Sequence, residues 1–141
     1  MQGAFFSEFA TDRHVIPPFA IPENWTRFRS MDWGSAKPFS VGWWAVSDGS
    51  VKGIARGALI KYREWYGKKT DNVGLKLHAD AVARGIKGMG GYEQYTYSVA
   101  DPSIFKEDGG PSISEMFRRE GVYFTPADNS RVACWNQIRK R

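Results

Sequence analysis

Aromatic and β-branched residues gather in three runs in the first half of the chain and predict β-strands. The runs cover residues 27–33, 39–47 and 54–66, and the turn-forming stretches 34–38 and 47–50 separate them. The Asp48-Gly49 dipeptide in the second stretch is a strong hairpin signal, because both residues tolerate the backbone of a tight turn. We therefore expect an antiparallel meander of three strands.

The pattern changes to a helical period after the polar stretch 67–72. Apolar residues then recur at the spacing of one helix face, at Leu75, Ala79, Val82 and Ile86. Glycines are frequent over residues 85–91, and this predicts a loop that ends the helix rather than a phosphate-binding turn, since no strand precedes it.

The remaining residues predict two short strands and two helices. A strand over residues 95–100 ends at Asp101, because Pro102 cannot donate a backbone hydrogen bond. Ser112 and Glu115 form a capping-box pattern for a helix that stops near Gly121. A fifth strand follows at 122–125. A last helix begins at Asp128 or Asn129, with apolar positions at Val132, Trp135 and Ile138.

The resulting order, β-β-β-α-β-α-β-α, predicts an α/β fold with a mixed five-stranded sheet flanked by helices. A helical crossover from the third strand to the fourth most simply places the fourth strand parallel to the first. Residues 1–26, with Pro17, Pro18 and Pro22, lack a sustained period and are expected to be a lead-in to a single domain at residues 27–141.

Composition narrows the class of protein. With 141 residues, 42% hydrophobic and 25% charged, the chain is that of one globular domain. A net charge of +5 favours polyanionic partners. Cys134 is the one cysteine, which excludes an intrachain disulfide and, with two histidines, a structural zinc site. No apolar run approaches the ~18 residues of a membrane span, and we expect a cytoplasmic protein with no membrane partner.

Two aspartates are placed where metal chemistry could occur. Asp32 ends the first predicted strand and Asp101 ends the fourth. If these strands are parallel neighbours, both carboxylates emerge at one edge of the sheet, and a divalent cation such as Mg²⁺ or Mn²⁺ would compensate their repulsion. The alternative is that each aspartate only ends a strand and caps a turn. The residues alone leave both interpretations open.

Three ordered blocks of the sequence carry a resemblance to a known family. The first runs from Phe28 through Asp32 to Phe39, the second is Ala100-Asp101-Pro102-Ser103-Ile104-Phe105 followed by residues 110–113, and the third spans residues 126–133. Together they resemble the nuclease domain of the large subunit of tailed-phage terminases, the enzymes that package viral DNA. Residues 3–9 and 14–16 are also similar to the family.

The resemblance implies a ribonuclease H-like fold and a metal-dependent endonuclease that cuts concatemeric double-stranded viral DNA. On the matching positions, Asp32 would bridge two Mg²⁺ or Mn²⁺ ions and Asp101 would be the acid of the fourth strand. The family's further acid lies beyond the Asp128-Asn129 block, so we expect little cleavage by these 141 residues alone. The family's partners are its own ATPase domain, the small terminase subunit and the portal. The sequence contains no P-loop that matches that ATPase.

Basic residues near the expected site are candidates for DNA contact. Lys37 lies in the turn after Asp32, and Arg131 and Arg139 belong to a basic strip on the last predicted helix. Asp128 could replace the third acid, although its context is typical of a helix N-cap. Two other functions stay open: a DNA-binding module that has lost catalysis, and another ribonuclease H-like nuclease such as a resolvase or transposase core.

Overall fold

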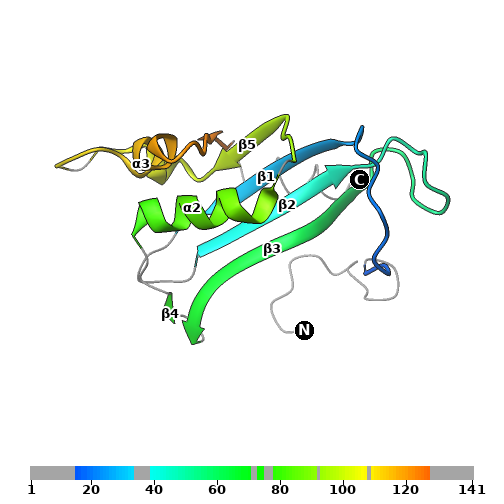
Figure 1. The fold of residues 1–141 in the computed structure, drawn as a ribbon, viewed down its shortest axis with the longest axis horizontal. Helices are drawn as coiled ribbons and strands as arrows, with labels where there is room; N and C mark the ends of the chain where they lie inside the picture. Colours follow the sequence, from blue (N-terminus) through cyan, green and yellow to red (C-terminus); the bar gives the residue numbers. More distant parts are fainter. Residues whose placement is uncertain are drawn as a thin grey trace.

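A computed structural model describes residues 15–33, 39–70, 73–74, 78–91, 93–107 and 109–127 (Figure 1). The elements in chain order are β1 (Thr26–Asp32), β2 (Phe39–Val46), β3 (Leu59–Thr70), β4 (Val73–Gly74), α2 (Ala79–Gly90), β5 (Tyr97–Ala100), η1 (Pro102–Phe105), α3 (Ile113–Arg119) and β6 (Thr125–Pro126). The five predicted strands are present, and the two-residue β4 adds an edge strand. The sheet order is β4-β3-β2-β1-β5-β6.

The antiparallel meander of β1, β2 and β3 confirms the prediction for the first half of the chain. Phe28 lies opposite Trp44, and Val41 lies opposite both Met31 and Trp65. The connection between β2 and β3 is longer than the four-residue turn predicted at 47–50. Gly49, Gly53 and Gly57 all have positive φ there, so the chain turns repeatedly before β3 begins at Leu59.

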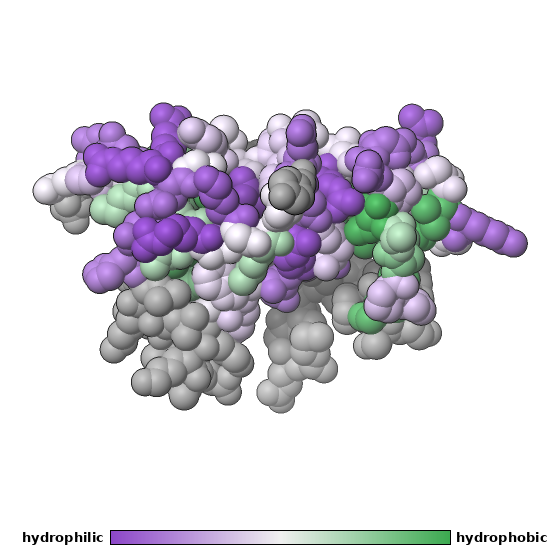
Figure 2. All heavy atoms as spheres, viewed as in Figure 1, coloured by the Kyte–Doolittle hydropathy of each residue, from purple (hydrophilic) through white to green (hydrophobic). Residues whose placement is uncertain are grey.

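The crossover through α2 places β5 parallel to β1, as the sequence predicted. Their register pairs Phe28 with Tyr97 and Met31 with Ala100. Figure 1 shows α2 lying across β1 and β2, with α3 beside it towards β5. The helices therefore cover one face of the sheet, and the outer surface of this layer is largely hydrophilic in Figure 2.

The hydrophobic core lies between these helices and the sheet. Alternate residues of β2 point into it, because successive side chains of a strand face opposite sides. Phe39, Val41, Trp43 and Ala45 are all at most 1% exposed. From the helices, Val82, Ile86 and Phe117 fill the space above them.

The glycine-rich stretch 85–91 is helical up to Gly90, so the predicted loop is wrong at these residues. A Cβ on Gly85 would lie 2.5 Å from the Trp65 ring, and one on Gly90 would overlap the Tyr95 hydroxyl. The glycines permit close contact between α2 and its neighbours. Only Gly91, with φ of +56°, acts as the predicted stop.

The second predicted helix is confirmed, and the last strand is shorter than expected. The Ser112 side chain accepts a hydrogen bond of 3.1 Å from the Glu115 backbone N–H at the start of α3. Residues 122–124 are irregular, and β6 contains only Thr125 and Pro126. Among the described residues, no helix has the length and hydrophobicity needed to cross a membrane.

Candidate metal centre

The register of β1 and β5 brings Asp32 and Asp101 to the same end of the sheet. Asp32 is the last residue of β1, and Asp101 follows the last residue of β5. The preceding residues, Met31 and Ala100, are paired, and the Asp101 N–H donates to the Met31 carbonyl at 3.3 Å. Neighbouring strands are ~4.8 Å apart, so the two aspartates lie side by side.

Both carboxylates point away from the hydrophobic core. Met31 and Ala100 are buried, and side chains alternate along a strand, so Asp32 and Asp101 face the other way. Asp32 is exposed and Asp101 is half-buried. The Asp101 carboxylate also accepts a hydrogen bond of 2.8 Å from the Ser103 N–H and caps η1. The capping role predicted as the alternative is therefore real for Asp101, and it leaves further lone pairs for a ligand.

The donor set fits a hard divalent cation. Within the described ranges, no basic side chain forms an ion pair with Asp32 or Asp101. No group of three or more His, Cys, Asp or Glu side chains that could hold a metal occurs among those residues either. Mg²⁺ commonly binds through one or two carboxylates and keeps several waters. Asp32 and Asp101 would hold such an ion, which would supply charge neutralisation and Lewis acidity.

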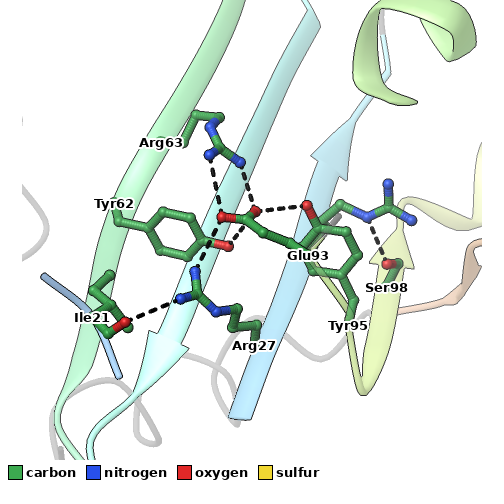
Figure 3. A network of polar contacts seen from close by, with 8 residues as sticks. Ile21, Arg27, Tyr62, Arg63, Glu93, Tyr95 and Ser98 are labelled. Carbon is green, nitrogen blue, oxygen red and sulfur yellow. Dashed lines mark hydrogen bonds and ion pairs between the residues drawn. The ribbon is translucent and has the colours of Figure 1, made fainter. Parts of the chain in front are cut away.

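A second polar cluster surrounds Glu93 on the helix-bearing face (Figure 3). Arg63 holds both carboxylate oxygens of Glu93, with N–O distances of 2.8 and 3.2 Å, and Arg27 adds a contact of 3.2 Å. The hydroxyls of Tyr95 and Tyr62 donate to the same carboxylate at 2.9 and 3.1 Å. Glu93, a loop residue, thereby links β1, β3 and the segment that precedes β5.

The electrostatics of this cluster follow from burial and hydrogen bonding. Burial raises the pKa of Glu93, but hydrogen bonds from Arg63 and Tyr95 and the charge of Arg63 outweigh it and lower that pKa. Burial and the hydrogen bond to Glu93 raise the pKa of Tyr95 to about 12. Glu93 is therefore a carboxylate that accepts hydrogen bonds from protonated side chains, and the role of the cluster is structural.

Arg29 is buried next to this cluster without contacting Glu93. It is 9% exposed, and its Nε donates to the Ser98 hydroxyl at 2.9 Å. The Arg29 guanidinium lies over the rings of Tyr95 and Phe124, at 4.4 and 5.4 Å from their centroids. Burial lowers the pKa of Arg29, and electrostatic interactions with Tyr95 and Tyr62 act in the opposite direction.

Comparison with known proteins identifies the architecture. No family model and no curated protein matches this chain. Solved structures do match it. The large terminase of a thermophilic bacteriophage aligns over 94% of this chain with a TM-score of 0.63 and 20% identity. The nuclease domain of the P22 large terminase also aligns over 94%, with a TM-score of 0.65 and 13% identity. The chain has the fold of a phage large-terminase nuclease domain.

This likeness confirms the ribonuclease H-like α/β fold that the sequence resemblance implied. The chain spans 30% of the thermophilic-phage large terminase and 65% of the P22 nuclease domain. A structure of the same thermophilic-phage terminase in complex with ADP matches over 90% of this chain, with a TM-score of 0.64 and 21% identity, and the chain spans 28% of that protein.

The described part of the chain includes some of the predicted site residues and not others. The register of β1 and β5 brings Asp32 and Asp101 together at the sheet edge. Lys37, Arg131 and Arg139, predicted to contact DNA, lie outside the described residues, as does Asp128. Their roles stay predictions.

Sequence reasoning missed the Glu93 cluster and the Arg29–Ser98 pair. The available signal was the run Thr26-Arg27-Phe28-Arg29, in which arginine occupies alternate positions of a strand. Arginines with that spacing share one face, and on a sheet face that packs against helices they need buried partners.

Proposed function

We propose that this chain is the nuclease domain of a phage terminase large subunit and a metal-dependent endonuclease that cuts concatemeric double-stranded DNA. The observation that carries the proposal is the placement of Asp32 beside Asp101 by the parallel β1–β5 register. The terminase nuclease fold and the three sequence blocks support it.

In this proposal, the two carboxylates hold Mg²⁺ or Mn²⁺ at the end of the sheet. The bound cation would polarise the scissile phosphate and lower the pKa of an attacking water. The residues of this chain bind the ion and orient it, since β1 and β5 are central strands with little freedom. The further acid that the family carries after the block at 126–133 would complete the ligand set.

The proposal extends to a whole protein of the kind that the thermophilic-phage structures represent. There the nuclease domain would act beside an ATPase domain, the small terminase subunit and the portal, in the cytoplasm of the infected cell. Duplex DNA would lie across the edge that carries Asp32 and Asp101, with Lys37, Arg131 and Arg139 neutralising its phosphates.

The test is nicking of supercoiled plasmid by the full natural gene product that carries residues 1–141. We expect nicking that requires Mn²⁺ or Mg²⁺ and is abolished by Asp32→Asn or Asp101→Asn. Asp80→Asn is the matched control, because Asp80 is half exposed on α2 and paired with Arg84. Activity that survives either site substitution would overturn the assignment.

One observation favours a second candidate, a DNA-binding module without catalysis. The described residues supply two clustered carboxylates and no group of three. Such a module would bind duplex DNA with the same affinity in Mn²⁺ and in chelator, and would not nick it. The plasmid assay separates the two functions directly.

A further inference from the structure

The buried Arg29–Ser98 hydrogen bond lies directly upstream of the two acids. Arg29 and Ser98 are register partners in the parallel pair, and each lies three residues before an aspartate. Both are nearly inaccessible, at 9% and 6% exposure. The bond is therefore a side-chain link between β1 and β5 inside the core, ~10 Å from the carboxylates at 3.3 Å per residue.

A polar pair at this place needs an explanation. Burying a guanidinium costs free energy, and an apolar pair of similar volume packs as well or better. Among the described residues, no carboxylate contacts Arg29. Glu93 instead binds Arg27 and Arg63. Within the described ranges, the polar and ring contacts of Arg29 are the Ser98 hydroxyl and the rings of Tyr95 and Phe124.

The pair discriminates between strand registers. A shift of two residues towards the carboxyl end of β5 would set Arg29 against Ala100, which offers no side-chain acceptor. A buried donor without an acceptor is penalised more heavily than a lost apolar contact. The same shift would set Asp32 against Ser103 rather than Asp101. The two aspartates and the Arg29–Ser98 pair lie on the same two strands, so a change of register affects both.

We propose that Arg29 and Ser98 are positioning residues for the candidate metal centre: their hydrogen bond holds β1 and β5 in the register that sets Asp32 beside Asp101. The expected effect on affinity for a divalent cation rests on the proposed function. The alignment of the two strand ends does not depend on a metal and can be measured without one.

The key variant is the double substitution Arg29→Met/Ser98→Ala in the full chain. It replaces the polar pair by an apolar one and leaves no buried donor unsatisfied. The first readout is hydrogen exchange of the Asp101 amide, which donates to the Met31 carbonyl at the site. We expect this amide to exchange about tenfold faster, the effect of losing one ordinary hydrogen bond, while amides paired between β2 and β3 keep their rates.

The second readout is Mn²⁺ affinity, followed by paramagnetic broadening of amide signals. Residues that orient metal ligands from outside the ligand set typically change affinity by ~10- to 100-fold, and we expect a loss of about tenfold. A role of Arg29 through its charge predicts the opposite. Removing a buried positive charge ~10 Å away would tighten cation binding.

Two single variants sharpen the test. Ser98→Thr keeps the hydroxyl and is expected to behave like the wild type in both readouts, whereas Ser98→Ala should show the defect. Thr125→Val is the matched control, because it removes the 3.2 Å hydrogen bond from the Thr125 hydroxyl to the Ser98 carbonyl on the β6 side. It should leave Asp101 exchange unchanged.

The proposal is overturned if Asp101 exchange in the double variant equals that of the wild type. Tighter Mn²⁺ binding by that variant, a defect in Ser98→Thr, or an equal defect in Thr125→Val would each overturn it too. A wild-type chain that gives no Mn²⁺ response contradicts the proposed function instead. In that case the exchange of the Asp101 amide still decides whether the pair positions the strands.

Discussion

Glu93 concentrates the polar contacts of the helix-bearing face on one carboxylate. Its donors come from β1, from β3 and from its own loop, and the Glu93 side chain is 22% exposed. Charge-assisted hydrogen bonds of this kind contribute more than neutral ones. Substituting Glu93 by an uncharged residue would deprive two arginines and two tyrosines of their charged acceptor. The loss of stability would come mainly from these partly buried donors, which water does not fully solvate.

Glu93→Gln should lower the free energy of unfolding by about 2 kcal/mol at neutral pH. The direction in which this contribution to the free energy of unfolding changes with pH follows from the lowered pKa of Glu93. Its stabilisation is complete above the ordinary value of 4.5 and is lost as pH falls through the lower folded value. Urea unfolding at neutral pH and at a series of acidic values measures this. A variant that unfolds like the wild type throughout would show that the cluster contributes nothing.

The alternating arginines of β1 indicate that buried partners are needed, but the sequence does not show which residues those partners are. Arg27 and Arg29 lie 66 and 69 residues from the partners they contact, Glu93 and Ser98. No local pattern links such positions, because strand pairing alone brings them together. Asp32 and Asp101 were predicted because each ends a strand and lies in a block that resembles the terminase family.

At the scale of the elements, the strands and the crossover followed from local patterning, while the glycine-rich stretch did not. Glycine lowers helix propensity, so residues 85–91 predicted a loop. The helix persists because Gly85 admits the ring of Trp65, a contact between α2 and β3 that only the folded sheet creates. Tertiary packing there outweighs local preference.

Two alanine substitutions on α2 test this explanation. Gly85→Ala should destabilise the protein by roughly 1–3 kcal/mol, because the new Cβ would lie 2.5 Å from the Trp65 ring. Gly88→Ala should stabilise it by about 0.5–1 kcal/mol, since beyond the adjacent helix backbone and the two neighbouring residues no atom lies within 4 Å of that Cβ. Thermal unfolding of both variants checks the signs. A stabilised Gly85→Ala protein would contradict the close packing of α2 on β3.

At the scale of the whole molecule, the net charge of +5 favours binding to DNA, whereas the carboxylates of Asp32 and Asp101 at the ends of β1 and β5 oppose it. Two carboxylates repel a phosphate backbone unless a cation and flanking basic residues offset them. Three or four phosphate contacts predict a slope of about −3 in log affinity against log salt, at roughly −0.9 per contact.

Lys37→Ala or Arg131→Ala should reduce the steepness of that slope by about one unit without changing sequence preference, because phosphate contacts do not read bases. Fluorescence anisotropy of a random duplex over a salt series measures it. Affinity that does not vary with salt, or slopes equal to that of the wild type, would show that the +5 charge is ordinary surface charge.

The central claim is that Asp32 and Asp101 together hold a divalent cation, and Mn²⁺ titration followed by amide spectra tests it most directly. The wild type should show selective broadening around the ends of β1 and β5, and Asp32→Asn should lose it while Asp80→Asn keeps it. Identical responses of the wild type and Asp32→Asn at millimolar Mn²⁺ would contradict the account.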